Sequence, residues 1–177
     1  MLLTFGHGAA SAEQLVSLLH NAGISMVVDV RTVPASRRHP HVARAEIRRW
    51  LPDADIGYRW DKRLGGLRKP EPDSPDVAWQ VDSLRGYAGH MRTPDFLAAV
   101  DQVLALASVR KTAVMCAESL WWRCHRRMLA DFICSARGVP VFHLMHDGRL
   151  EEHQLSPGLR LCEDGLLVYD AGQERLL

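Results

Sequence analysis

This sequence has no long hydrophobic run, little net charge and only four cysteines. No segment approaches the roughly 18 to 20 consecutive apolar residues of a membrane-spanning helix, so we expect no membrane partner. Met1–Phe5 lacks the basic start of a secretory signal, and His7 interrupts the apolar residues. We therefore expect a cytoplasmic protein with reduced cysteines. Cys134 and Cys162 lie among apolar residues, as small core side chains do.

Several familiar functional motifs are also absent. The turn Gly6-His7-Gly8 is neither the G-x-G-x-x-G fingerprint of dinucleotide-binding proteins nor a phosphate-binding P-loop. No C-x-x-C motif of the thioredoxin type occurs. Since there is no internal repeat, low-complexity tract or linker, we expect residues 1–177 to form a single α/β domain.

Positive charge gathers in one part of the chain. The 22 lysines and arginines nearly cancel the 21 acidic residues, so the net charge predicts no class of partner. Residues 31–49, however, carry six arginines against one glutamate, and prolines divide residues 31–75 into loops around a short helix near Ala43–Trp50. A basic, loop-rich insertion of this length is more often functional than idle. Its charge suits an anionic ligand or nucleic acid, and equally the solvated faces of surface helices.

Alternating strand and helix patterns predict the fold. Leu2–Phe5 is apolar and precedes a helix that Ser11 can cap, and Met26–Val30 is a second buried strand. Strand, helix and strand in this order imply parallel pairing. Ala113–Cys116 continues the pattern, and a turn within residues 159–169 predicts a hairpin. We expect a three-layer α/β fold with a mostly parallel central sheet, helices on both faces and a C-terminal hairpin.

The segment Met115–Arg127 holds the densest chemistry of the chain. Its sequence, M-C-A-E-S-L-W-W-R-C-H-R-R, connects a buried strand to a helical pattern. Cys116 and Glu118 are therefore expected at the carboxyl end of a strand, and Cys124–Arg126 at or near the start of a helix. Open α/β sheets bind ligands at this edge, where helix N-termini also favour anions.

Other predicted strand ends bring further polar side chains to the same edge. His7 follows the first strand, and Asp29 with Arg31 ends the second, with both side chains on one face. Arg31 together with Ser36, Arg37 and Arg38 predicts an anion clamp, because guanidinium groups bind phosphate through paired hydrogen bonds. Asp29 is either a site residue or a structural acceptor.

A reactive thiol is the sharpest chemical hypothesis. Cys124 at a helix start, beside His125 and Arg126, should have a lowered pKa. Cys116 would be its partner or a resolving thiol. The spacing argues against a phosphatase-type loop, because such a loop has five residues between its cysteine and its arginine, whereas six residues separate Cys116 from Arg123.

The candidates divide into two groups, with Asp29 or Glu118 expected to orient a histidine. The catalytic candidates are Cys124, His125, Cys116, Glu118, His7 and Asp29. The anion-binding candidates are Arg31, Ser36, Arg37 and Arg126. A zinc site built from Cys116, Cys124 and His125, with or without His7, is an alternative. No pair of these residues has the spacing of structural zinc sites, so we assign no metal and leave any cofactor open.

These motifs together resemble the bacterial family called domain of unknown function 488. The matching segments are Thr4–Gly8, Val28–Pro40, Leu64–Gly66, Tyr87–Met91, Met115–Glu118 and Cys124–Arg126. The resemblance implies a shared site without a particular reaction, because none is established for the family. Members usually carry serine after the first Gly-His, where this chain has Gly8.

The favoured function is binding of, or action on, a small anionic ligand such as a nucleotide-like molecule. Whether the protein is an enzyme, and its oligomeric state, are left open. The alternative is a nucleic-acid-associated protein, for DNA repair or nucleobase handling, in which the basic insertion and Trp121 with Trp122 hold a base. In a competing interpretation the two tryptophans simply pack under the insertion.

Overall fold

The computed structural model describes residues 1–170, and residues 171–177 of the predicted domain lie outside the described part. Its central sheet consists of β1 (Leu2–Gly6), β2 (Met26–Asp29), β3 (Gly57–Trp60), β4 (Thr112–Cys116), β5 (Val141–Leu144) and β6 (Leu150–Glu152). The strand order is β3-β2-β4-β1-β5-β6, and β6 alone runs antiparallel to its neighbour. The predicted mostly parallel sheet is confirmed.

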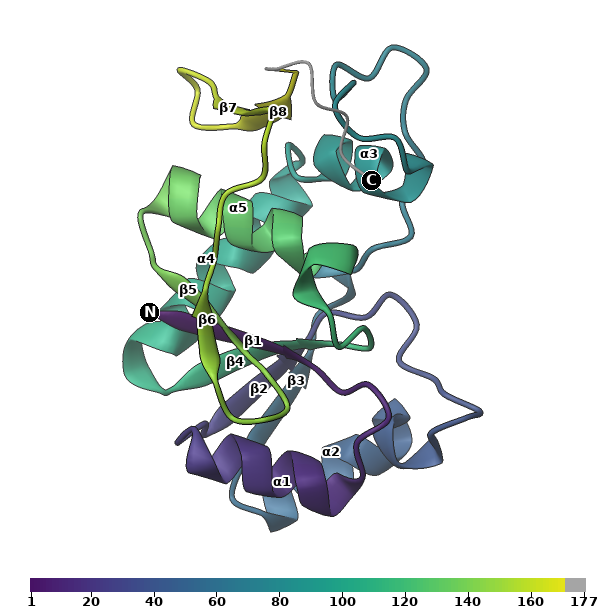
Figure 1. Ribbon diagram of the computed structural model, residues 1–177, viewed down its shortest axis with the longest axis vertical. Helices are drawn as coiled ribbons and strands as arrows, with labels where there is room; N and C mark the ends of the chain where they lie inside the picture. The colour runs from purple at the N-terminus through teal and green to yellow at the C-terminus, as the bar shows by residue number, and fades with distance from the viewer. Residues whose placement is uncertain (171–177) are drawn as a thin grey trace.

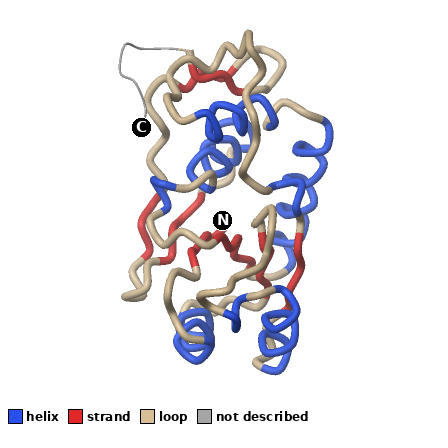
Figure 2. The backbone as a smooth tube through the Cα atoms, turned by 90° about the vertical axis from the view of Figure 1, so that its right-hand side faces the viewer, coloured by secondary structure: helices blue, strands red, loops and turns tan. Residues whose placement is uncertain are grey.

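Helices cover both faces of this sheet (Figures 1 and 2). They are α1 (Ala12–Asn21), α2 (Arg44–Asp53), α3 (Asp82–His90), α4 (Pro94–Val109) and α5 (Arg126–Arg137), with short 3-10 turns at Pro40–Val42, Lys62–Leu64 and Trp121–Arg123. None of the helices in residues 1–170 is long and apolar enough to cross a membrane. The three-layer α/β architecture agrees with the sequence-based prediction.

The alternation of side chains along the strands creates two cores. Leu3 and Phe5 of β1 pack with α1 and α2, whereas Leu2 packs with the helices of the other face. In β4, the side chain of Met115 faces α1 and α2, whereas that of Cys116 faces the helices on the other side of the sheet. Cys116 is therefore directed toward α5, the helix that follows it in the chain.

Local sequence signals set the helix ends. Ser11 and Gln14 form a capping box at the start of α1, as the sequence predicts. Thr93 caps α4, and Pro94 occupies its first position. Gly138 ends α5 in the left-handed conformation, with φ of 63°.

The structure differs from the sequence-based expectation in two strands and two cysteines. Within the basic insertion, Gly57–Trp60 forms the edge strand β3, and its pattern of half-buried residues gives no apolar run that would reveal it. The exposed strand β6 was also not predicted. Cys134 and Cys162, expected in the core, are only half-buried.

The predicted C-terminal hairpin is confirmed as β7 (Leu159–Leu161) and β8 (Leu167–Tyr169). A buried ion pair ties it to the rest of the protein. Arg92 donates to the carboxylate of Asp76, whose atoms are fully buried, and also to the carbonyl of Leu167 at 2.9 Å. The backbone amide of Tyr169 donates to Asp76 at 3.1 Å. The hairpin thus packs over α3 and α5, at the top of Figure 1.

Candidate functional site

The candidate site lies where the chain leaves the sheet in opposite directions. β1 leads to α1 on one face, and its neighbour β4 leads to α5 on the other (Figure 1). Loops that diverge from the carboxyl ends of adjacent parallel strands leave a crevice, which is where open α/β sheets bind ligands. A cavity of about 370 Å³ occupies this place.

Most of the residues selected from the sequence line this cavity. They are His7, Arg31, Ser36, Cys116, Glu118, Cys124 and His125. Asp29 and Arg126 are buried and do not reach the cavity surface. Arg37 is exposed and does not line it. The basic insertion therefore contributes Arg31 and Ser36 to the wall, but not the second arginine of the expected clamp.

Among the lining residues that were not selected from the sequence, three bear on the chemistry of the site. Arg123 stands just before Cys124 in the loop, and Leu84 comes from α3. Gly66 packs so closely on the imidazole that a Cβ atom there would lie 2.9 Å from His125 Nδ1. The Leu64–Gly66 motif was a signal for this contact, because glycine often marks a close approach of the backbone to a side chain or ligand.

Two sulfur atoms and an imidazole nitrogen meet on the cavity floor. Nδ1 of His125 lies 3.6 Å from Cys124 Sγ and 3.9 Å from Cys116 Sγ. The three donor atoms are all within 4.8 Å of one another, close enough to bind a single metal ion. Cys124 and Cys116 are 7% and 8% exposed, so a reagent can reach them only through the cavity.

The two thiols have opposite tendencies to ionise. The Cys116 thiol shares a hydrogen bond with Cys124 and holds the pKa of Cys124 well below its usual range, with help from the charges of His125 and Arg126. The same hydrogen bond and burial raise the pKa of Cys116. The pair therefore favours a thiolate at Cys124 and a protonated thiol at Cys116.

Arg126 is a buried cation without an acidic partner. Its side chain is 1% exposed, and within residues 1–170 it forms no ion pair with a carboxylate. One terminal nitrogen donates to Thr4 Oγ1 at 3.2 Å, and the other donates to the backbone carbonyl of Glu118. Its Nε atom has no partner. The guanidinium thus holds the loop after β4 by a hydrogen bond, and no carboxylate of residues 1–170 neutralises its charge.

A second arginine is held by the carboxylate of Asp29. Arg31 donates to Asp29 through Nε at 2.9 Å and Nη2 at 2.6 Å, and Tyr58 donates to the same carboxylate at 2.7 Å. Nη1 of Arg31 approaches His7 Nε2 at 3.3 Å. Asp29 therefore orients an arginine and not a histidine. The carboxylate of Glu118 accepts from a backbone amide two residues later, so it does not orient a histidine either.

His7 is neutral in this arrangement. Burial lowers its pKa from 6.5 to about 4, and the positive charge of Arg31 adds to the effect. Nδ1 lies 2.9 Å from the carbonyl of Gly8, which can only accept, so the proton belongs on Nδ1. Nε2 is then free to accept from Arg31.

A buried chain of hydrogen bonds leads from Arg126 away from the cavity. Thr4 Oγ1 contacts His143 Nδ1 at 2.7 Å, and His143 Nε2 contacts His153 Nδ1 at 3.0 Å. His153 Nε2 contacts Asp131 at 2.8 Å. Because the carboxylate accepts, each imidazole donates toward Asp131 and accepts from the side of Thr4. Burial lowers the pKa of His143 to about 2, which keeps this ring neutral.

Trp121 packs on the two histidines of this hydrogen-bond series, and Trp122 packs on Trp121, so the expected packing under the basic insertion is not what holds them. Trp121 stacks on His143 with ring centroids 4.2 Å apart, and its Nε1 donates to Glu151. Trp122 packs edge-on against Trp121 and is 41% exposed. Trp121 is therefore occupied within the protein, and Trp122 alone presents an open ring.

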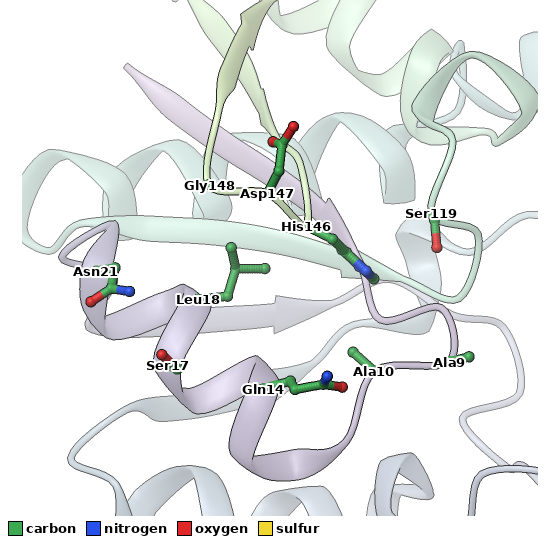
Figure 3. A pocket seen from close by; sticks show the side chains of 10 residues that line it. All are labelled: Ala9, Ala10, Gln14, Ser17, Leu18, Asn21, Ser119, His146, Asp147 and Gly148. Atoms are coloured by element: carbon green, nitrogen blue, oxygen red, sulfur yellow. The ribbon is translucent and has the colours of Figure 1, made fainter.

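A second hollow, of about 600 Å³, lies between α1 and the turn after β5 (Figure 3). Ser119 and His146 line it, and His146 Nε2 contacts the carbonyl of Gly6 at 2.6 Å. Gly8 has φ of 51°, and a Cβ atom on it would lie 2.2 Å from Ser119 Oγ. Ser119 thus occupies the space that a serine at position 8 would need.

The sequence matches a known protein family. The model of the family described as Domain of unknown function DUF488 matches residues 11–133. No curated protein matches the chain, and neither does any solved structure.

A serine at position 8 should be tolerated only when Ser119 is removed. Gly8→Ser is expected to destabilise the protein by about 1–2 kcal/mol from the left-handed backbone, with a further loss from the contact with Ser119. Ser119→Gly should restore part of this loss. Urea unfolding of the two single variants and the double variant measures the coupling, and strictly additive effects would contradict the contact.

Acid should destabilise the protein through His7. Because the folded-state pKa is about 4 and the usual value is 6.5, the unfolded chain binds a proton that the folded chain excludes. The neutral His7 therefore contributes to the free energy of unfolding above pH 6.5. This contribution is lost as the pH falls toward 4, by up to about 1.4 kcal/mol per pH unit. In urea unfolding at several pH values, the free energy of unfolding of His7→Asn should fall less steeply with decreasing pH than that of the wild type. The control His20→Asn removes an exposed histidine, and an equal slope for H7N and wild type would contradict a neutral His7.

Proposed function

Because the chain belongs to the family described as domain of unknown function 488, whose name assigns no reaction, we propose its function from the crevice itself. The protein binds a small anionic ligand between the loops that follow β1 and β4, and Cys124 reacts with it as a thiolate. Arg31 and Arg123 line the cavity and hold the negative charge. Apolar side chains such as Leu84 suit a ligand that also has a planar part, as a nucleotide-like molecule has.

The buried guanidinium of Arg126 is the observation that carries this proposal. Arginine does not lose its proton in proteins, and a buried cation without a counter-charge is strongly destabilising. With no carboxylate paired to Arg126 in residues 1–170, the negative charge must come from the site. The thiolate of Cys124 supplies part of it, and a bound anion adds to the same balance.

We assign a separate chemical role to each of the three residues on the cavity floor. Cys124 Sγ donates an electron pair to an electrophilic atom of the ligand, and the leaving group departs with the electrons of the broken bond. Cys116, whose thiol stays protonated, can give its proton to that leaving group. His125 positions the attacking sulfur through the 3.6 Å contact of its Nδ1.

Nucleic acid is the second candidate, favoured by the exposed arginines Arg37 and Arg38 and by the open ring of Trp122. Salt separates the two functions. Extended contacts with phosphates would lower affinity steeply as salt rises, with each neutralised phosphate of a single strand adding about 0.7 to the logarithmic slope. We expect a fluorescent single-stranded oligonucleotide to bind weakly at physiological salt, with no loss on Trp122→Ala. Tight, salt-sensitive binding that W122A abolishes would favour the second candidate.

Iodoacetamide should alkylate Cys124 roughly tenfold faster than Cys134 in the native, metal-free protein at neutral pH. Cys124 is reached through the cavity as a thiolate, whereas burial raises the pKa of Cys134. Peptide mapping by mass spectrometry gives both rates in one sample. Arg126→Met should slow the reaction of Cys124, and the control Arg137→Met at the far end of the same helix should not.

Inorganic phosphate supplies the test of the anion. At millimolar concentration it should slow alkylation of Cys124 and leave that of Cys134 unchanged, and Arg123→Ala should weaken this protection. Arg37→Ala is the matched control, because Arg37 does not line the cavity. A Cys124 that reacts no faster than Cys134 would remove the nucleophile from the proposal.

A further inference from the structure

The three donor atoms on the cavity floor have the arrangement of a metal site. We propose that Cys116, Cys124 and His125 bind one zinc ion, with the fourth coordination position open to the cavity. This inference rests on the proposed function for the identity of the fourth ligand, a small anion. The binding of the metal itself rests on the three side chains alone.

The distances match tetrahedral coordination. Zinc–sulfur bonds of about 2.3 Å and zinc–nitrogen bonds of about 2.0–2.1 Å, at tetrahedral angles, place a sulfur and a nitrogen about 3.6 Å apart and two sulfurs about 3.8 Å apart. His125 Nδ1 lies 3.6 Å from one sulfur and 3.9 Å from the other. All three atoms fall within 4.8 Å of one another, so small side-chain adjustments suffice to close the site.

The backbone fixes these ligands from three different elements. Cys116 ends β4 in the middle of the sheet, and its carbonyl accepts from the amide of His7 at 2.9 Å. The carbonyls of Cys124 and His125 accept the first amides of α5. Gly66 packs closely against the imidazole of His125. The donor atoms are therefore held together before any ion binds.

The donor set selects the kind of ion. Two thiolates and an imidazole are soft ligands that suit zinc and similar ions, whereas calcium and magnesium prefer oxygen ligands. Among residues 1–170 no carboxylate belongs to this group of donors. Zinc bound by two thiolates carries no net charge, so the buried guanidinium of Arg126 still calls for an anion. Inorganic phosphate or hydroxide at the fourth position supplies it.

Zinc and the proposed nucleophile use the same sulfur atom. In the metal-free protein Cys124 reacts with an electrophile, and in the zinc-bound protein it is a ligand and does not. His125 Nε2 is buried without a hydrogen-bond partner, whereas metal-bound histidines usually donate from their second nitrogen. Because loss of such a partner typically weakens metal binding about 10–100-fold, we expect zinc to bind reversibly.

Cobalt(II) is the spectroscopic probe for this site. Full-length protein is reduced, stripped with a chelator and titrated with cobalt(II), which should give sulfur-to-cobalt charge transfer and the intense visible bands of tetrahedral coordination, saturating at one ion per chain. Cys116→Ser, Cys124→Ser and His125→Asn should each weaken binding by at least about 10-fold. Cys134→Ser and Cys162→Ser are matched controls that should bind as wild type does.

Two results would overturn the metal site: no thiolate–cobalt band in the wild-type protein, or a band that survives in the Cys116→Ser, Cys124→Ser double variant. Circular dichroism checks that each variant is folded. A second readout is protection, because zinc should slow alkylation of Cys124 and leave Cys134 unchanged. Rapid alkylation that zinc does not slow contradicts the metal site and leaves the proposed function standing. If instead the protein binds cobalt but the metal-free Cys124 does not react, the metal site stands and the proposed function is contradicted.

Discussion

The burial of one positive charge constrains the whole site. Arg126 begins α5, is 1% exposed and has no carboxylate paired to it within residues 1–170. Its guanidinium donates to the carbonyl of Glu118, in the loop that leads from β4 to Cys124. A buried cation favours negative charge around it. In the proposed function, an ionised Cys124 and a bound anion are the two groups that would supply this negative charge.

The rest of the interior keeps this cation in place. Thr4 accepts from Arg126 and is itself linked through His143 and His153 to the carboxylate of Asp131. All of these groups are buried, and the acceptor at one end sets the direction of each hydrogen bond. The floor of the cavity is thus backed by a rigid polar network, whereas its outer wall comes from the loops after β2 and β3 and from the start of α3.

Strand ends could be predicted from the sequence, but the directions of side chains in irregular segments could not. The positions of Cys116 and His7 follow from the apolar runs before them, because parallel strands share one carboxyl edge. The loop before α5 contains a 3-10 turn, Trp121–Arg123, whose geometry no periodic pattern reveals. For that reason Arg123 was missed, and Arg126 was expected to contact the ligand although it is buried. The spacing of structural zinc ligands describes residues within one short motif, so it gives no information on the three donor atoms that meet here from a strand end, a loop and a helix start.

The charge on Cys124 is the most direct test of the central claim that the crevice balances a buried arginine. Ultraviolet thiolate absorbance of the reduced, metal-free protein at neutral pH, compared with Cys124→Ser, counts the ionised sulfur at that position. We predict that the absorbance of the wild-type protein exceeds that of Cys124→Ser by the amount expected for one thiolate. This difference should disappear in Arg126→Met and remain in Arg137→Met. Equal absorbance of wild type and C124S would mean that Cys124 is protonated beside Arg126, which contradicts the electrostatic basis of the site.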